Sequence, residues 1–111
     1  MNHLTHRTNL IASHYFQSDA EWAIDLLQSF CENIAEYIFD KTSPESYERF
    51  CLAILKISKT SKEKFLDTIE LAESDYRDLL VVAGFANSIT IHNDWADAII
   101  KAHNKKQQVI R

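Results

Sequence analysis

The stretch SDAEWAIDLLQSFCENIAEYIFD, residues 18–40, decides the fold class of this chain. Its apolar side chains recur every three or four positions, so at about 100° per residue they gather on one side of an α-helix. This apolar stripe consists of Trp22, Leu26, Leu27, Phe30, Ile34, Tyr37 and Ile38. Ser18 and Glu21 have the spacing of a capping box, in which each side chain bonds the other residue's backbone N–H. Together these signals predict an amphipathic helix over residues 19–40.

A second helix is predicted from Pro44 to about Ile57, because proline is best tolerated in a first helical turn. Its expected inward face consists of Tyr47, Phe50, Cys51, Ile54 and Ile57. Leu52 then falls on the outer face, as does Phe39 on the preceding helix. Single apolar residues of this kind are common on monomer surfaces, so they leave monomer and homodimer equally open.

Three further helices are predicted, over about residues 61–73, 74–83 and 88–106. Their expected caps are Thr60 or Ser61, then Ser74 with Asp75, and finally Ser88 or Thr90. Gly84 ends the middle one of the three, because glycine readily adopts the left-handed conformation of a helix C-terminus. Phe85 is placed to contact the last turn of that helix. The residues expected to point inward include Phe65, Leu66, Ile69, Tyr76, Leu79, Ile91, Trp95, Ala98, Ile99 and Ala102.

The whole chain, residues 1–111, is expected to form a single helical domain, because its length is near the commonest domain size. The expected fold class is all-α, a compact irregular bundle of five to six helices. Residues 1–17 lack good caps and are expected to form a weakly ordered N-terminal segment, with a short helix there as the alternative. Residues 107–111 are expected to be a frayed tail.

Composition disfavours several classes of function. The chain has one glycine, whereas phosphate-binding loops need two or three at fixed spacing. Its 12 Lys and Arg against 16 Asp and Glu give a net charge of −4, which disfavours binding to nucleic acid. No apolar run approaches the roughly 18 residues that cross a bilayer. We therefore expect a cytoplasmic protein without a cofactor.

Metal and catalytic sites are also disfavoured by spacing. His92 and His103 would lie about 16 Å apart along one helix, too far to share an ion, and are better explained as half-buried packing residues. Cys31 and Cys51 both fall on apolar faces, where burial makes a thiol a poor nucleophile. Their similar distances from the bend near residue 42 suggest that they are neighbours. A reducing cytoplasm then favours free thiols, with a disulfide as the alternative. We expect no enzymatic activity, although a small enzyme with an unrecognised site stays an alternative.

A helix-turn-helix regulator that binds DNA is the main alternative, with Tyr76 and Arg77 opening the recognition helix. The charge of this segment argues against binding to DNA. Between Ser61 and Ala83, three basic residues (Lys62, Lys64, Arg77) stand against six acidic ones (Glu63, Asp67, Glu70, Glu73, Asp75, Asp78), a sum of −3. Contacts to phosphate need the opposite sign.

The outer face of the helix predicted over residues 19–40 carries only negative charge. The helix contains six acidic residues and neither Lys nor Arg. The candidate partner-binding residues on this face are Glu21, Asp25, Glu32, Glu36 and Asp40. Several of them form like-charge pairs four residues apart, which slightly destabilise a helix. A solvated surface, or pairing with Lys101, Lys105 or Lys106, would explain the face without a partner. Our hypothesis is a protein–protein interaction module (an adaptor, inhibitor or regulatory partner) that docks a basic surface on another protein.

The start of the sequence, Met1-Asn2-His3, is a candidate site for Cu(II) or Ni(II). The amine of Met1, two amide nitrogens and the imidazole of His3 form a four-nitrogen set that suits a square plane. A copper titration of protein with an unmodified N-terminus is expected to develop the visible band of such a complex, and failure to do so would refute this chemistry. The binding need not serve any biological purpose, because a third-position histidine arises by chance.

Overall fold

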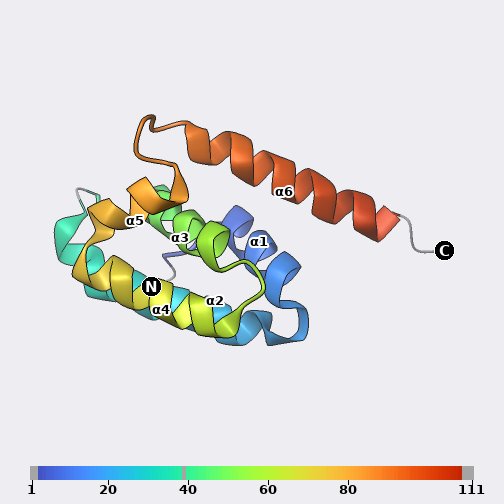
Figure 1. Ribbon diagram of the computed structural model, residues 1–111, viewed down its shortest axis with the longest axis horizontal. Helices are drawn as coiled ribbons and strands as arrows, with labels where there is room; N and C mark the ends of the chain where they lie inside the picture. Colours follow the sequence, from blue (N-terminus) through green and yellow to red (C-terminus); the bar gives the residue numbers. More distant parts are fainter. Residues whose placement is uncertain (1–2, 39, 109–111) are drawn as a thin grey trace.

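The computed structural model describes residues 3–38 and 40–108, and it places them in helices joined by short connections (Figure 1). The α-helices are α1 (His6–Phe16), α2 (Ala20–Ile34), α3 (Glu45–Ser58), α4 (Lys62–Ser74), α5 (Tyr76–Ala83) and α6 (Ile91–Gln108). Two 3₁₀ segments, η1 (Gln17–Asp19) and η2 (Ala35–Tyr37), flank α2. No strand occurs among these residues, so the predicted all-α bundle is confirmed. Within the same ranges, no helix is long and apolar enough to cross a membrane.

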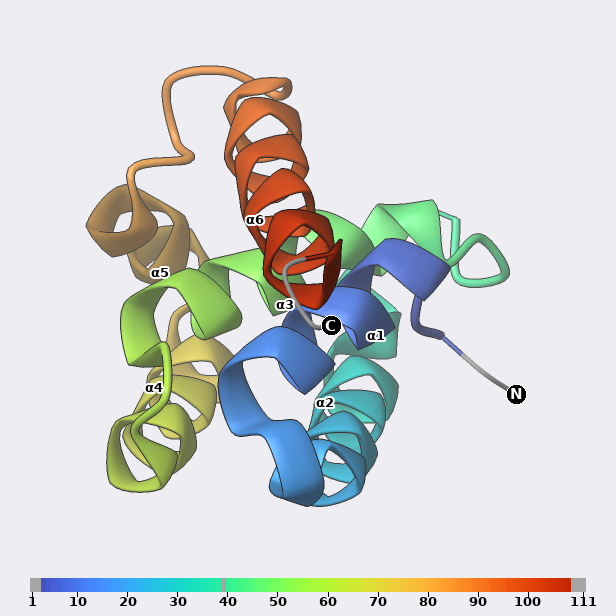
Figure 2. The ribbon, with the colours of Figure 1, turned by 90° about the vertical axis from the view of Figure 1, so that its right-hand side faces the viewer.

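The third helix, α3, is the centre of the bundle. It packs against α1, α4, α5 and α6, which surround it in Figure 2. Its side chains are therefore buried on almost every side, including Leu52, which is fully buried. The expectation of an outward-facing Leu52 was wrong, because a helix enclosed by four others has no continuous solvent face. Phe39 lies outside the described residues.

The second helix, α2, is shorter than the predicted 19–40. The capping box of Ser18 and Glu21 does not form; Asp19 is the N-cap residue, and its side chain bonds no backbone N–H there. At the other end, Ile38 leaves the helical conformation with φ −97° and ψ 131° and is buried in the core. The neighbouring Tyr37, predicted to face inward, is 61% exposed instead.

The N-terminal segment contributes α1, which packs against both α2 and α3. Thr5 is its N-cap, since the Thr5 hydroxyl accepts a hydrogen bond from the backbone N–H of Thr8. Residues 6–16 thus form a packed helix, which is the alternative that the sequence left open for this segment. At the other terminus, α6 continues through Gln108, and residues 109–111 of the expected frayed tail lie outside the described residues.

Three predicted caps are present. The Ser61 hydroxyl accepts from the Lys64 N–H at 3.1 Å, and the Asp75 carboxylate accepts from the Asp78 N–H at 3.1 Å. Gly84 has the left-handed φ of 80°, and the N–H of the buried Phe85 donates to the carbonyl of Leu80 at 2.9 Å. This geometry is the Schellman ending that the Gly-Phe pair predicts.

Two helices turn a slightly different face inward than predicted. On α4, Leu66 is 48% exposed, whereas Phe65 is buried as expected and Ala72 is buried as well. On α6, Ala98 and Ala102 are exposed, and Ala96 is the buried residue. The reason is that α6 contacts only α1 and α3 closely, so a narrow stripe of its surface is covered.

A buried ion pair joins α1, α3 and α6. Glu48 of α3 is 7% exposed, and its carboxylate accepts hydrogen bonds from the Thr5 hydroxyl and from the guanidinium of Arg7. Arg7 also donates to Asn93 and, at 3.5 Å, to Asp97 on α6. Burial opposes the charge of Glu48, yet the bonds from Arg7 and Thr5 hold the pKa of its carboxyl below its ordinary value.

Removing the Glu48 carboxylate is expected to be strongly destabilising. Glu48→Ala leaves the partly buried Arg7 without its buried partner, so that only Asn93 and the exposed Asp97 remain to it. We therefore expect a loss of about 3 kcal/mol in the free energy of unfolding, the lower end for buried pairs. Urea denaturation measures this loss. The exposed Glu70 of α4 provides the matched control, since Glu70→Ala should cost less than about 0.5 kcal/mol. Equal losses for the two variants would contradict a stabilising role of the ion pair.

Candidate functional site

All five carboxylates predicted to bind a partner are exposed, and we call them the acidic face. Glu21, Asp25 and Glu32 lie on α2, Glu36 lies on η2, and Asp40 lies in the following loop. The prediction that Glu36 and Asp40 repel each other on one helix was wrong, because α2 ends at Ile34. The side chain of Asp40 instead accepts from the hydroxyl and the N–H of Thr42, at 2.7 and 3.1 Å, which lowers the pKa of its carboxyl.

The acidic face takes part in no ion pair within the part of the chain that the structure describes. The ion pairs there join Arg7 to Glu48 and Asp97, and Lys62 to Asp19 at 2.9 Å. Lys62 therefore neutralises the acidic residue just before α2 and none of the five. The negative charge of the acidic face is therefore available to solvent ions or to another molecule.

Pairing of the acidic face with lysines of α6 does not occur for Lys101 and Lys105. Figure 2 shows why: α1 lies between α6 and α2, and it packs against both. The side chain of Lys106 lies outside the described part of the chain.

A stacked pair of tyrosines, the exposed Tyr37 and the half-buried Tyr76, lies at the C-terminal end of the acidic face. The ring of Tyr37 stacks on that of Tyr76 from α5, with centroids 5.9 Å apart and planes inclined by 29°. Tyr76 in turn meets Phe50 of α3 edge-on at 5.7 Å, which fixes the pair to the core. Interaction with the neighbouring Glu36 carboxylate raises the pKa of the Tyr37 phenol.

Sequence reasoning missed this tyrosine pair because it placed Tyr37 in the core stripe. The sequence did contain a local signal. Tyr37 and Ile38 are adjacent, and where a helix ends only one of two adjacent side chains can point into the core. The structure buries the aliphatic side chain and exposes the one with a hydroxyl. Tyr76 was predicted to face inward and is half-buried.

The two cysteines meet in the core as predicted. The Sγ atoms of Cys31 and Cys51 are 3.4 Å apart, and both thiols are free and fully buried. The contact with Cys31 and the burial raise the pKa of the Cys51 thiol well above its ordinary value. Neither thiol is suited to nucleophilic chemistry, which needs an accessible thiolate.

The histidines are dispersed, and no group of three potential metal ligands occurs in the part of the chain that is described. The imidazole of His3 packs on Tyr47, with ring centroids 4.7 Å apart, and its backbone N–H donates to Gln28 at 2.9 Å. A square-planar copper complex at His3 would have to break that hydrogen bond. His14 and His103 place their Nδ1 atoms 3.2 Å apart between α1 and α6, a pairing that no sequence signal indicates.

His92 is half-buried, as predicted. Its ring lies 6.1 Å from that of Phe85, and no hydrogen bond to its buried Nδ1 occurs among the described residues. Burial lowers the pKa of His92 below its ordinary value of 6.5, despite the nearby charge of Glu48. The site therefore favours the neutral imidazole.

Comparisons with protein-family models, with curated proteins and with solved structures find no match to this chain.

His92 should make the protein less stable in acid. Because its pKa is lowered in the folded state, the unfolded state binds more protons below about pH 6.5, and folding stability falls as the pH falls through that region. The uncharged His92→Gln should therefore lose less stability than the parent between about pH 7.5 and pH 5.5, measured by urea denaturation. The other histidines are common to both proteins, so identical losses would show that His92 does not contribute.

Proposed function

We propose that this protein is a protein–protein interaction module whose acidic face docks a basic surface of another protein. The observation that carries the proposal is the exposure of five carboxylates without an ion-pair partner among the described residues, next to the exposed Tyr37. The adaptor, inhibitor and regulatory roles all use such a surface.

Each part of the surface suits a different part of binding. The carboxylates attract a basic partner over distance and reject acidic ones, which mainly affects the association rate and specificity. Tyr37 and Tyr76 provide a rigid aromatic contact of the kind that dominates binding energy in many interfaces. Because Tyr76 is held by Phe50, the pair loses little conformational freedom on binding.

A cytoplasmic site of action is part of the proposal. Cys31 and Cys51 lie within contact distance as free thiols, a state that a reducing compartment maintains. The helix-turn-helix alternative would use α4 and α5, where the acidic residues outnumber the basic ones. That charge opposes contact with DNA phosphates.

Site-specific crosslinking tests the proposal. Ser29 is exposed on α2 between Asp25 and Glu32, so a photoreactive amino acid at this position should crosslink a partner in a lysate of the source cells. Mass spectrometry of the crosslinked peptide should identify a segment rich in Lys and Arg. A photoreactive group at Glu70 of α4 is the control for random encounter.

Charge reversal should abolish that crosslink without unfolding the protein. Glu32→Lys with Glu36→Lys is expected to reduce capture at least about tenfold, whereas Asp67→Lys with Glu70→Lys on α4 makes the same change in net charge and should reduce it far less. Capture by the parent protein should also weaken with added salt.

Tyr37→Ala tests the aromatic part and should accelerate dissociation of the captured partner. Undiminished capture by the Glu32 and Glu36 variant, with its helical circular dichroism intact, would mean that the acidic face serves solubility alone.

A further inference from the structure

Two histidine rings meet where α1 and α6 pack side by side (Figure 2). His14 of α1 and His103 of α6 place their Nδ1 atoms 3.2 Å apart, and the centres of the two rings are 5.2 Å apart. Both residues are half-buried, so the pair lies at the edge of the helix interface, next to solvent. Neither residue belongs to the acidic face.

The spacing of the two rings is that of two imidazoles on one tetrahedral metal ion. Zn(II) holds each imidazole nitrogen at about 2.0–2.1 Å, so two ligand nitrogens lie about 3.3 Å apart and their ring centres about 5.2 Å apart. The observed separations of 3.2 and 5.2 Å agree with both values. Two rings aligned end to end at the same nitrogen separation would have their centres about 5.5 Å apart instead.

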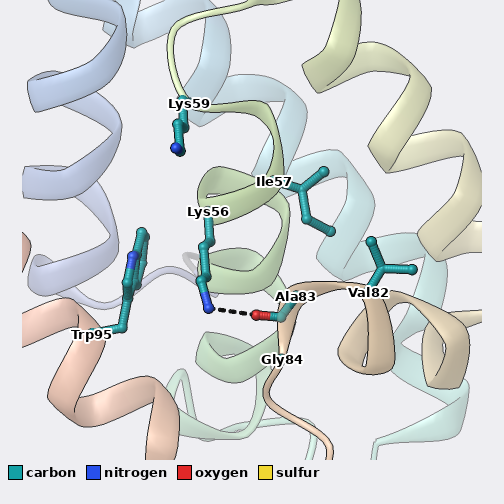
Figure 3. A pocket seen from close by; sticks show the side chains of 7 residues that line it. All are labelled: Lys56, Ile57, Lys59, Val82, Ala83, Gly84 and Trp95. Carbon is teal, nitrogen blue, oxygen red and sulfur yellow. Dashed lines mark hydrogen bonds between the residues drawn. The ribbon is translucent and has the colours of Figure 1, made fainter.

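Contacts elsewhere in the same interface fix the positions of the two histidines. Arg7 of α1 donates to Asn93 of α6, and Tyr15 stacks on Trp95 with ring centres 6.5 Å apart. Trp95 also lines one side of the open cleft shown in Figure 3. Because the two helices are already aligned, an ion that joins them loses little binding energy to ordering the protein.

The ligand type selects the class of ion. Imidazole suits Zn(II), Cu(II) and Ni(II), but the last two also suit the square-planar four-nitrogen set at the start of the chain. Zn(II) prefers the tetrahedron that the ring spacing fits. No third potential metal ligand joins the pair within the described part of the chain, so water has to fill the two remaining positions.

We propose that His14 and His103 together bind one Zn(II) ion through their Nδ1 atoms, so that the ion joins α1 to α6. Both Nδ1 atoms have to be unprotonated, and a ring that donates from Nδ1 in the free protein therefore carries its proton on Nε2 in the complex. With two protein ligands instead of four, the dissociation constant should be on the order of tens of micromolar.

Isothermal titration calorimetry with Zn(II), in a buffer that does not bind metal, should detect one ion per chain. His14→Gln and His103→Gln should each weaken binding at least about tenfold, because one imidazole is left. His6→Gln is the matched control, since His6 is exposed on α1 about two turns from His14 and its loss should leave the affinity unchanged. Circular dichroism checks that the variants keep the helical fold.

Nuclear magnetic resonance of the histidine rings tests the same site in the parent protein. Zn(II) should shift the Nδ1 resonances of His14 and His103 saturably and leave both rings with their proton on Nε2, whereas the rings of His6 and His92 should not change. The absence of binding at millimolar Zn(II), unchanged His14 and His103 rings on binding, or equal affinities of the His6 and His103 variants would each overturn the proposal.

Discussion

The buried carboxylate of Glu48 is the constraint on which the packing of the other helices depends. It lies on a helix enclosed by four neighbours, where an ionised group is strongly unfavourable unless it is hydrogen-bonded and paired. Thr5 and Arg7 satisfy it from the start of α1, and Arg7 extends the same network to α6. The N-terminal segment is therefore not an appendage, because its first residues compensate the charge that the central helix buries.

The enclosure of α3 also separates the exposed charges of opposite sign. With the core organised around α3, one flank of the molecule is the outer side of α2, whose charged side chains are all carboxylates. Another is an open cleft lined by Lys56 of α3, by Lys59 just after that helix, and by residues of α5 and α6. A net charge of −4 conceals this separation.

The acidic part of the candidate site could be predicted from the sequence, and its other parts could not. Exposure of Glu21, Asp25 and Glu32 follows from a helical period that places them opposite the apolar stripe, and the structure bears this out. The tyrosine pair depends on where α2 ends and on the approach of α5, which brings Tyr76 to Tyr37. The cleft joins three segments that are distant in sequence, so no single window of the chain indicates it.

What the sequence by itself determined is the local structure: the all-α class, most helix boundaries, and the caps at Ser61, Asp75 and Gly84. These features depend on bonds between residues three to five positions apart, which a linear pattern contains. Only the tertiary structure decided that Leu52 is buried and that residues 6–16 form a packed helix. The physical reason is that burial depends on which helices cover a given face. Helix α1 is held in place by hydrogen bonds to Glu48, which lies more than forty positions away in the sequence.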